Sequence, residues 1–256
     1  MNPSKIDELI DIIAALPGDW HGQGSVGRNV LTAIAKHINI AGGIQNSVET
    51  GSGKTTLLLS QISARHTVFA IDLGDSVSKV RNSAHFNAAT THYIEGPTQR
   101  TLPKYQSTGL NQLVLIDGPH GYPFPDLEYF YLYPTIAPGG LLIIDDIQIP
   151  SIQRMFEIIR AEDMFELIEV VDGNTAFFRR TPAPMIDPES DSWWLQGYNR
   201  EYYRKKTDLH PSIESPKTEL VRLLQAISRL TPMGVKKLVP RVIKEKIWQQ
   251  SAGRCD

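Results

Sequence analysis

The chain has 256 residues, of which 41% are hydrophobic and 21% are charged, and its formal net charge is −2. These proportions are typical of a globular protein and exclude disorder of the whole chain. A single cysteine excludes an intramolecular disulfide framework and a cysteine-based zinc cluster. No run of about 18 apolar residues exists, and the N-terminal segment has no secretory signal pattern, so we expect a cytoplasmic protein.

The predicted elements alternate along the chain. Residues 6–15 have the apolar spacing of an amphipathic helix, and a glycine-rich polar segment follows at 20–29. Short apolar runs then predict strands at 46–50, 67–72, 92–95, 112–117, 140–145, 167–172 and 176–180. Stretches of helical length lie between them at 55–64, 75–87, 126–136 and 151–161.

Several predicted strands are nearly continuous apolar runs that end in an acid, namely VFAID, LVLID and LLIID. Strands that are buried on both faces have this composition, as in a parallel sheet covered by helices. The alternation therefore predicts an α/β fold with a doubly wound, Rossmann-like sheet. Ligands bind such sheets at the carboxyl ends of the strands, where Asp72, Asp117 and Asp145 would lie on one rim.

A glycine-rich turn follows the first predicted strand and allows two interpretations. The end of a phosphate-binding P-loop is present as Gly53, Lys54 and Thr55, which would indicate an NTPase or kinase. However, the first glycine of that motif is replaced by Val48, and Glu49 would repel phosphates bound by the backbone amides. The P-loop interpretation is therefore the weaker alternative.

The second interpretation is a site for an amino acid joined to adenosine. Gly51 and Gly53 would let the backbone approach a ligand closely, and Glu49 would accept hydrogen bonds from an amine. The helix that begins at about residue 55 would favour a carboxylate at its N-terminus. S-adenosylmethionine carries both an amine and a carboxylate, whereas a dinucleotide site would require a glycine at the position of Thr56.

The next two strand ends extend this interpretation to adenosine. Asp72 lies 21 residues after Gly51, near the interval of about 20 residues at which an acid reaches a ribose hydroxyl. Its other interpretation is a helix cap. Gly96 and Thr98 follow the third strand, where an adenine edge would be recognised in the same geometry.

Together these motifs resemble the class I S-adenosylmethionine-dependent methyltransferases. The resemblance rests on ETGSGKT at 49–55, the acid at 72, EGPTQRTLP at 95–103, LIDGPH at 115–120 and APGGLLIIDD at 137–146. It is strongest to the small-molecule branch that includes macrocin- and novobiocin-type sugar O-methyltransferases and cephalosporin hydroxylase-like proteins. The resemblance implies seven strands with the seventh antiparallel, and methyl transfer to a hydroxyl of a small molecule such as a sugar.

The resemblance also implies candidate metal ligands and a candidate base. Asp117, Asp145 and Asp146 match positions that bind a divalent metal such as Mg²⁺ in some members, and these three carboxylates would otherwise repel one another. Pro119 stands where some members carry an acidic base, so His120 becomes the candidate general base beside Asp117. Pro119 also leaves open a hydroxylase-like member that does not methylate.

We predict two parts in the chain. Residues 1–182 would form the cofactor-binding domain, with 1–25 as an N-terminal helix and cap, and residues 183–256 a mainly helical extension. Residues 197–256 hold 13 basic and 6 acidic residues, so this tail is basic. A solvated charged face is the favoured interpretation of the tail, and an anionic membrane surface is the weaker one. An interface between copies of the chain is also open, whereas no motif indicates nucleic-acid binding.

Overall fold

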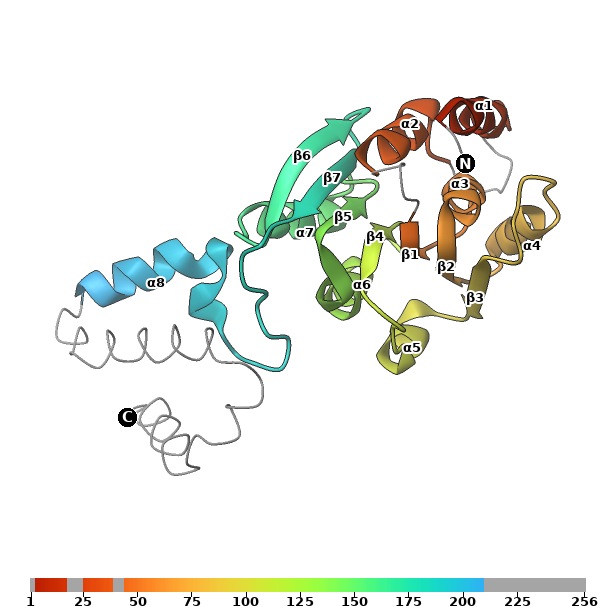
Figure 1. Ribbon diagram of the computed structural model, residues 1–256. Coiled ribbons are helices and arrows are strands. Elements are labelled where there is room, and N and C mark those ends of the chain that lie inside the picture. Colours follow the sequence, from red (N-terminus) through yellow and green to blue (C-terminus); the bar gives the residue numbers. More distant parts are fainter. Residues whose placement is uncertain (1–2, 18–24, 39–43, 210–256) are drawn as a thin grey trace, which may run out of the picture. The chain divides into compact units, whose positions relative to one another are not determined.

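The computed structural model describes residues 3–17, 25–38 and 44–209 (Figure 1). The chain divides into two compact units after Arg200, so residues 183–200 lie in the first unit. Most of the predicted extension, and residues 20–24 of the glycine-rich segment, lie outside the described residues. No described helix is long and apolar enough to cross a membrane.

One seven-stranded sheet forms the centre of the first unit, as predicted (Figure 1). The strands follow the order β3-β2-β1-β4-β5-β7-β6. Neighbours from β3 to β5 pair in parallel, and β7 runs antiparallel to both β5 and β6. The strand bounds are β1 Ile44–Thr50, β2 Ser63–Ala70, β3 Thr91–Glu95, β4 Asn111–Ile116, β5 Ile136–Ile144, β6 Phe165–Val171 and β7 Thr175–Arg180.

The helices connect these strands. Their bounds are α1 Pro3–Ala14, α2 Arg28–His37, α3 Lys54–Ile62, α4 Ser76–Arg81, α5 Thr98–Thr101, α6 Phe124–Leu132, α7 Pro150–Arg160 and α8 Gly197–Leu209. Short 3₁₀ turns lie at η1 Leu73–Asp75, η2 Leu102–Lys104, η3 Tyr133–Thr135 and η4 Trp193–Leu195.

The fourth helix is shorter than predicted. We expected a helix to residue 87, but α4 ends at Arg81. The Ser83 hydroxyl accepts a hydrogen bond from the His85 amide, and Asn87 does the same for Ala89. Such local side-chain bonds offer the backbone an alternative to the helix.

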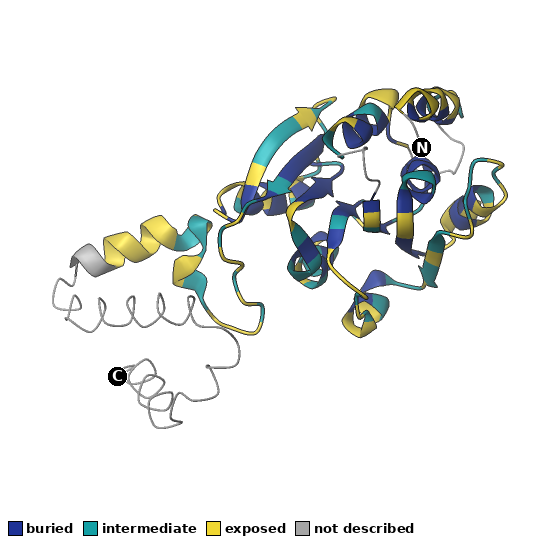
Figure 2. Ribbon diagram, viewed as in Figure 1, coloured by how far each residue is buried: buried dark blue, intermediate teal, exposed yellow. Residues whose placement is uncertain are grey.

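Successive residues of the central strands face two hydrophobic layers. Leu113 and Leu115 of β4 pack with α1, α2 and α3 on one face of the sheet. Val114 and Ile116 pack with η2, α6 and α7 on the other face. The central strands are accordingly mostly buried in Figure 2, whereas the edge strands β3 and β6 are largely intermediate or exposed and the helices present exposed outer faces. This alternation follows from the two-residue period of a strand.

The strand order reverses between β1 and β4. From β1 the chain proceeds outward to β2 and β3, then returns to form β4 on the other side of β1. The loops that follow these strands therefore diverge at their carboxyl ends and leave room for a ligand. A tight turn at Asp172 and Gly173, both with positive φ angles, joins β6 to β7 and reaches the same end of the sheet.

Candidate active site

A cavity of about 420 Å³ lies at the carboxyl ends of the parallel strands. Small-molecule sites commonly have volumes of about 300–1,000 Å³. Among the described residues that line the cavity, four are aspartates, one is a histidine and none is a lysine or arginine. These charged residues are Asp117, His120, Asp145, Asp146 and Asp172. The cavity therefore favours a cation or a neutral polar ligand over an anion.

The turn after β1 brings the backbone close to this cavity. Gly51 lines it with a φ of 89°, and its amide donates a hydrogen bond of 2.8 Å to the carbonyl oxygen of Phe69. A Cβ atom on Gly51 would lie 2.2 Å from the carbonyl oxygen of Asp117. Only glycine fits here without moving the loop after β4. Gly53 does not line the cavity, and its amide donates to the Thr56 hydroxyl at 2.9 Å.

Glu49 also lies outside the lining, because its side chain is buried beneath the turn. The Thr56 hydroxyl donates to its Oε1, and His66 Nε2 lies 3.2 Å from the same oxygen. Its Oε2 has no hydrogen-bond partner among the described residues. In this structure Glu49 links β1 to α3 and β2, and its contact with a cofactor amine stays a prediction.

Lys54 is not placed to bind phosphates. It is buried, and its Nζ donates a hydrogen bond of 2.7 Å to the carbonyl oxygen of Leu16. Burial also lowers the pKa of this amine. A P-loop lysine must reach the phosphates of the nucleotide. The side chain points elsewhere, which argues against the NTPase interpretation.

The predicted adenosine end is partly assembled. Gly96 and Thr98 line the cavity, and so do the exposed apolar side chains of Ile71 and Leu73. Asp72 stands between these two apolar residues but does not line the cavity.

The carboxylate of Asp72 caps α4 instead. It accepts hydrogen bonds from the Val77 amide at 2.9 Å and from the Ser78 hydroxyl at 2.6 Å. The hydrogen bond from Ser78 is the main reason that the pKa of Asp72 lies below its usual range. The alternative interpretation of Asp72 as a cap thus describes this structure, and its contact with ribose stays a prediction.

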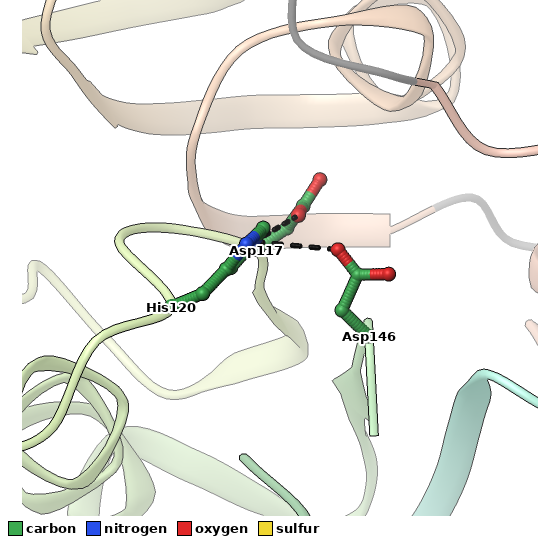
Figure 3. Close-up of side chains that lie close together, drawn as sticks. All are labelled: Asp117, His120 and Asp146. Carbon is green, nitrogen blue, oxygen red and sulfur yellow. Dashed lines mark ion pairs between the residues drawn. The ribbon is translucent and has the colours of Figure 1, made fainter. Parts of the chain in front are cut away.

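Three titratable side chains from the ends of β4 and β5 meet at the cavity (Figure 3). His120 Nε2 lies 3.8 Å from Asp117 Oδ1 and 3.4 Å from Asp146 Oδ2. Burial raises the pKa of Asp117 to about 7, and the neighbouring Asp145 and Asp146 carboxylates add to this effect. The Asp117 carboxylate in turn raises the pKa of the His120 imidazole.

The paired acids after β5 have different surroundings. One ligand atom from each of Asp117, His120 and Asp146 lies within 4.8 Å of the others, an arrangement that could hold a metal ion. Asp145 is absent from this group, because its Oδ1 accepts a hydrogen bond from the buried Thr175 hydroxyl. The structure therefore groups His120, and not Asp145, with the two other predicted ligands.

Comparison with known proteins agrees with this architecture. Residues 48–147 match a family model described as a methyltransferase domain. This part of the chain is thus similar to a methyltransferase domain.

Solved structures with the same fold include three O-methyltransferases. NovP has 19% sequence identity and a TM-score of 0.52, with 70% of this chain and 98% of that chain covered. TomG from Streptomyces achromogenes, in complex with S-adenosylmethionine, has 14% identity, a TM-score of 0.51, and 68% and 90% coverage. An enzyme from Bacillus cereus, in complex with S-adenosylhomocysteine, has 17% identity, a TM-score of 0.50, and 71% and 92% coverage. No curated protein sequence matches the chain.

One buried acid of the methyltransferase was missed by the sequence analysis. Glu128 of α6 has 0% exposure, and its Oε2 accepts a hydrogen bond of 2.7 Å from the Thr50 hydroxyl. Burial raises the pKa of Glu128 to about 7. The signal in the sequence is an acid within the largely aromatic segment LEYFYLY, but its partners lie far away along the chain.

Proposed function

We propose that this methyltransferase transfers the methyl group of S-adenosylmethionine to a hydroxyl of a small neutral molecule such as a sugar. The observation that carries the proposal is the position of His120, which lies between two carboxylates on the wall of a cavity at the topological switch point. Methyl transfer to an alcohol requires removal of the hydroxyl proton, and imidazole is suited to this near neutral pH.

The cavity suits the cofactor. The Gly51 turn leaves the backbone close to the ligand, and Ile71 and Leu73 offer apolar surface for the adenine ring. The sulfonium cofactor supplies an electrophilic methyl group with a good leaving group. The chain's own part is to hold the acceptor in line with that methyl group, which is the main demand of a displacement reaction.

The charge of the cavity limits the acceptor. Four carboxylates line it, and no described lysine or arginine is present to pair with a phosphate or carboxylate of the acceptor. An anionic group near the methyl position would therefore be repelled. The hydroxyl groups of a neutral polyhydroxyl compound would donate hydrogen bonds to these carboxylates without electrostatic repulsion.

In this mechanism His120 accepts the proton of the acceptor hydroxyl. Asp117 and Asp146 flank the imidazole and stabilise its protonated form. Asp117 raises the pKa of His120, so the imidazole loses its proton at a higher pH than an isolated histidine. It can act as a base only after it has lost this proton. The rate should thus increase with pH through the titration of His120.

The same three residues also fit a divalent cation. Asp117, His120 and Asp146 would hold it, and it would lower the pKa of a bound hydroxyl. Burial raises the pKa of Asp117, and a bound cation would favour its ionised form. Two carboxylates and one imidazole suit Mn²⁺ or Zn²⁺ at least as well as Mg²⁺, which prefers oxygen ligands.

The test is methyl transfer from isotopically labelled S-adenosylmethionine to a panel of sugars and other neutral alcohols. We expect His120→Asn to lose activity by about two to four orders of magnitude, because it removes the base. His92→Asn, an exposed histidine of β3 outside the cavity, is the matched control and should retain activity.

The assay is repeated in excess chelator and with added Mg²⁺, Mn²⁺ or Zn²⁺. Full activity in chelator would exclude the metal-assisted variant, and loss that an added ion restores would support it. Full activity of His120→Asn would refute the assigned base. Binding of cofactor without transfer to any alcohol would favour a hydroxylase-like member of the fold.

A further inference from the structure

A buried carboxylate lies directly behind the cavity wall. Glu128 belongs to α6, and it is fully buried. Its Oε2 accepts a hydrogen bond of 2.7 Å from the Thr50 hydroxyl at the end of β1. Thr98 and Gly118 lie near the carboxylate and favour its ionised form, but its Oε1 has no hydrogen-bond partner among the described residues. Residues from the ends of β1, β3 and β4 therefore surround one buried side chain.

Each of these three residues is connected to the wall of the cavity. Thr98 and Gly118 line it directly. The Thr50 hydroxyl, besides donating to Glu128, accepts a hydrogen bond of 3.1 Å from the amide of Asp117. Glu128 thus reaches Asp117 through one intermediate hydroxyl, and it does not line the cavity itself.

The fit around this carboxylate is tight. A Cβ atom on Gly118 would lie 2.2 Å from Glu128 Oε1, so only glycine leaves room for the acid. A leucine would fill a similar volume without the cost of burying a carboxylate. The Thr50 hydroxyl would then be buried without this acceptor, which is unfavourable. The carboxylate is therefore explained by the Thr50 hydroxyl, which also contacts the amide of Asp117.

We propose that Glu128 is a positioning residue, which fixes Thr50 and, through it, the loop at Asp117 and Gly118 in the conformation that forms the cavity wall. Its effect on catalysis rests on the proposed function, whereas its effect on the loop does not. A side chain of this kind acts through the groups that it holds, so its loss should change the site more than the rest of the fold.

Glu162 offers a matched control. It is also a buried carboxylate that accepts a backbone hydrogen bond, from the Gly197 amide at 3.0 Å, and burial also raises its pKa. It follows α7 and does not line the cavity. Leucine and glutamine variants at both positions therefore compare the loss of a buried acid behind the cavity with a similar loss elsewhere. These variants are Glu128→Leu, Glu128→Gln, Glu162→Leu and Glu162→Gln.

Two readouts are measured on the full chain, namely hydrogen–deuterium exchange of residues 113–124 and the Kd for S-adenosylhomocysteine. We expect faster exchange of this segment in Glu128→Leu and a Kd raised by about tenfold or more, since the buried Thr50 hydroxyl loses its acceptor. Glu128→Gln keeps one acceptor oxygen and should give an intermediate result. The Glu162 variants should leave both readouts at the wild-type level, even where they lower the Tm.

The proposal is overturned if exchange of residues 113–124 in the Glu128 variants matches the wild type, or if the Glu162 variants change both readouts equally. Should Glu128→Leu fail to fold, Glu128→Gln decides by the same criteria. If the wild type binds no S-adenosylhomocysteine, the proposed function fails, and the exchange of residues 113–124 still decides the role of Glu128.

Discussion

Replacing Gly51 by alanine should damage both the fold and the cofactor site. Two effects combine at this position. The φ of 89° is unfavourable for an L-residue, at a cost of about 1–2 kcal/mol. The added Cβ would lie 2.2 Å from the carbonyl oxygen of Asp117, and overpacking of this kind costs about 1–3 kcal/mol more. We therefore expect Gly51→Ala to lower the free energy of unfolding by about 2–5 kcal/mol.

Gly139 provides the control for the backbone effect. It has a similar φ of 78°, but a Cβ there would meet no atom within 4 Å. Gly139→Ala should cost only about 1–2 kcal/mol, and it lies outside the cavity. The difference between the two variants, about 1–3 kcal/mol, isolates the collision with the loop after β4.

Urea unfolding would give the two free energies, and calorimetry would give the Kd for S-adenosylhomocysteine. Gly51→Ala should bind this product much more weakly than Gly139→Ala, because the collision displaces Asp117 from the cavity wall. Equal free energies of unfolding for the two variants would refute the collision. Equal binding would refute the assignment of the Gly51 turn to the cofactor site.

Two further predictions concern the acids near the site. The pKa of Glu128 is about 7 in the folded chain against an ordinary 4.5, so between these values the folded state holds the proton that the unfolded state has lost. Stability should therefore fall as pH rises from 4.5 to 7, by about 3 kcal/mol from this group. Glu128→Gln should flatten this part of the pH profile of urea unfolding, and an unchanged profile would show that Glu128 titrates normally. Asp72→Ala should speed amide exchange at Val77 and Ser78, which lose their cap, and should weaken S-adenosylhomocysteine binding by about tenfold if Asp72 also binds ribose. Faster exchange with an unchanged Kd would leave Asp72 as a cap alone.

The sheet could be predicted because its strands are buried on both faces. Runs such as LVLID lack the apolar spacing of an amphipathic helix, which favours a strand. The terminal acids mark where each strand ends. The antiparallel β7 was expected only through the resemblance to known methyltransferases. The length of α4 could not be predicted, because the local hydrogen bonds of Ser83 and Asn87 override the helical pattern.

The site was predicted best where backbone position decides contact. Gly51, Gly96 and Asp117 line the cavity because each directly follows a strand end. Side-chain direction was less predictable, since Glu49 points into the core and Asp72 toward α4. Each has a neighbouring hydroxyl or amide that competes for its carboxylate, and a sequence does not show which partner prevails.

The partners of Glu128 were beyond sequence reasoning for a related reason. Thr50 precedes it by 78 residues, and their contact exists only because β1 and β4 are adjacent. Likewise, Asp145 and Asp146 are neighbours in sequence, but successive side chains at a strand end point to different sides. One of them therefore meets Thr175 and the other meets His120.

The surplus of carboxylates around the cavity has a consequence for turnover. The sulfonium of S-adenosylmethionine is positively charged, whereas the thioether left after transfer is neutral. An acidic wall attracts the first and gains nothing from the second, so spent cofactor should leave more readily than fresh cofactor. The same acids would thereby limit inhibition by the product, and added salt should narrow the gap between the two affinities.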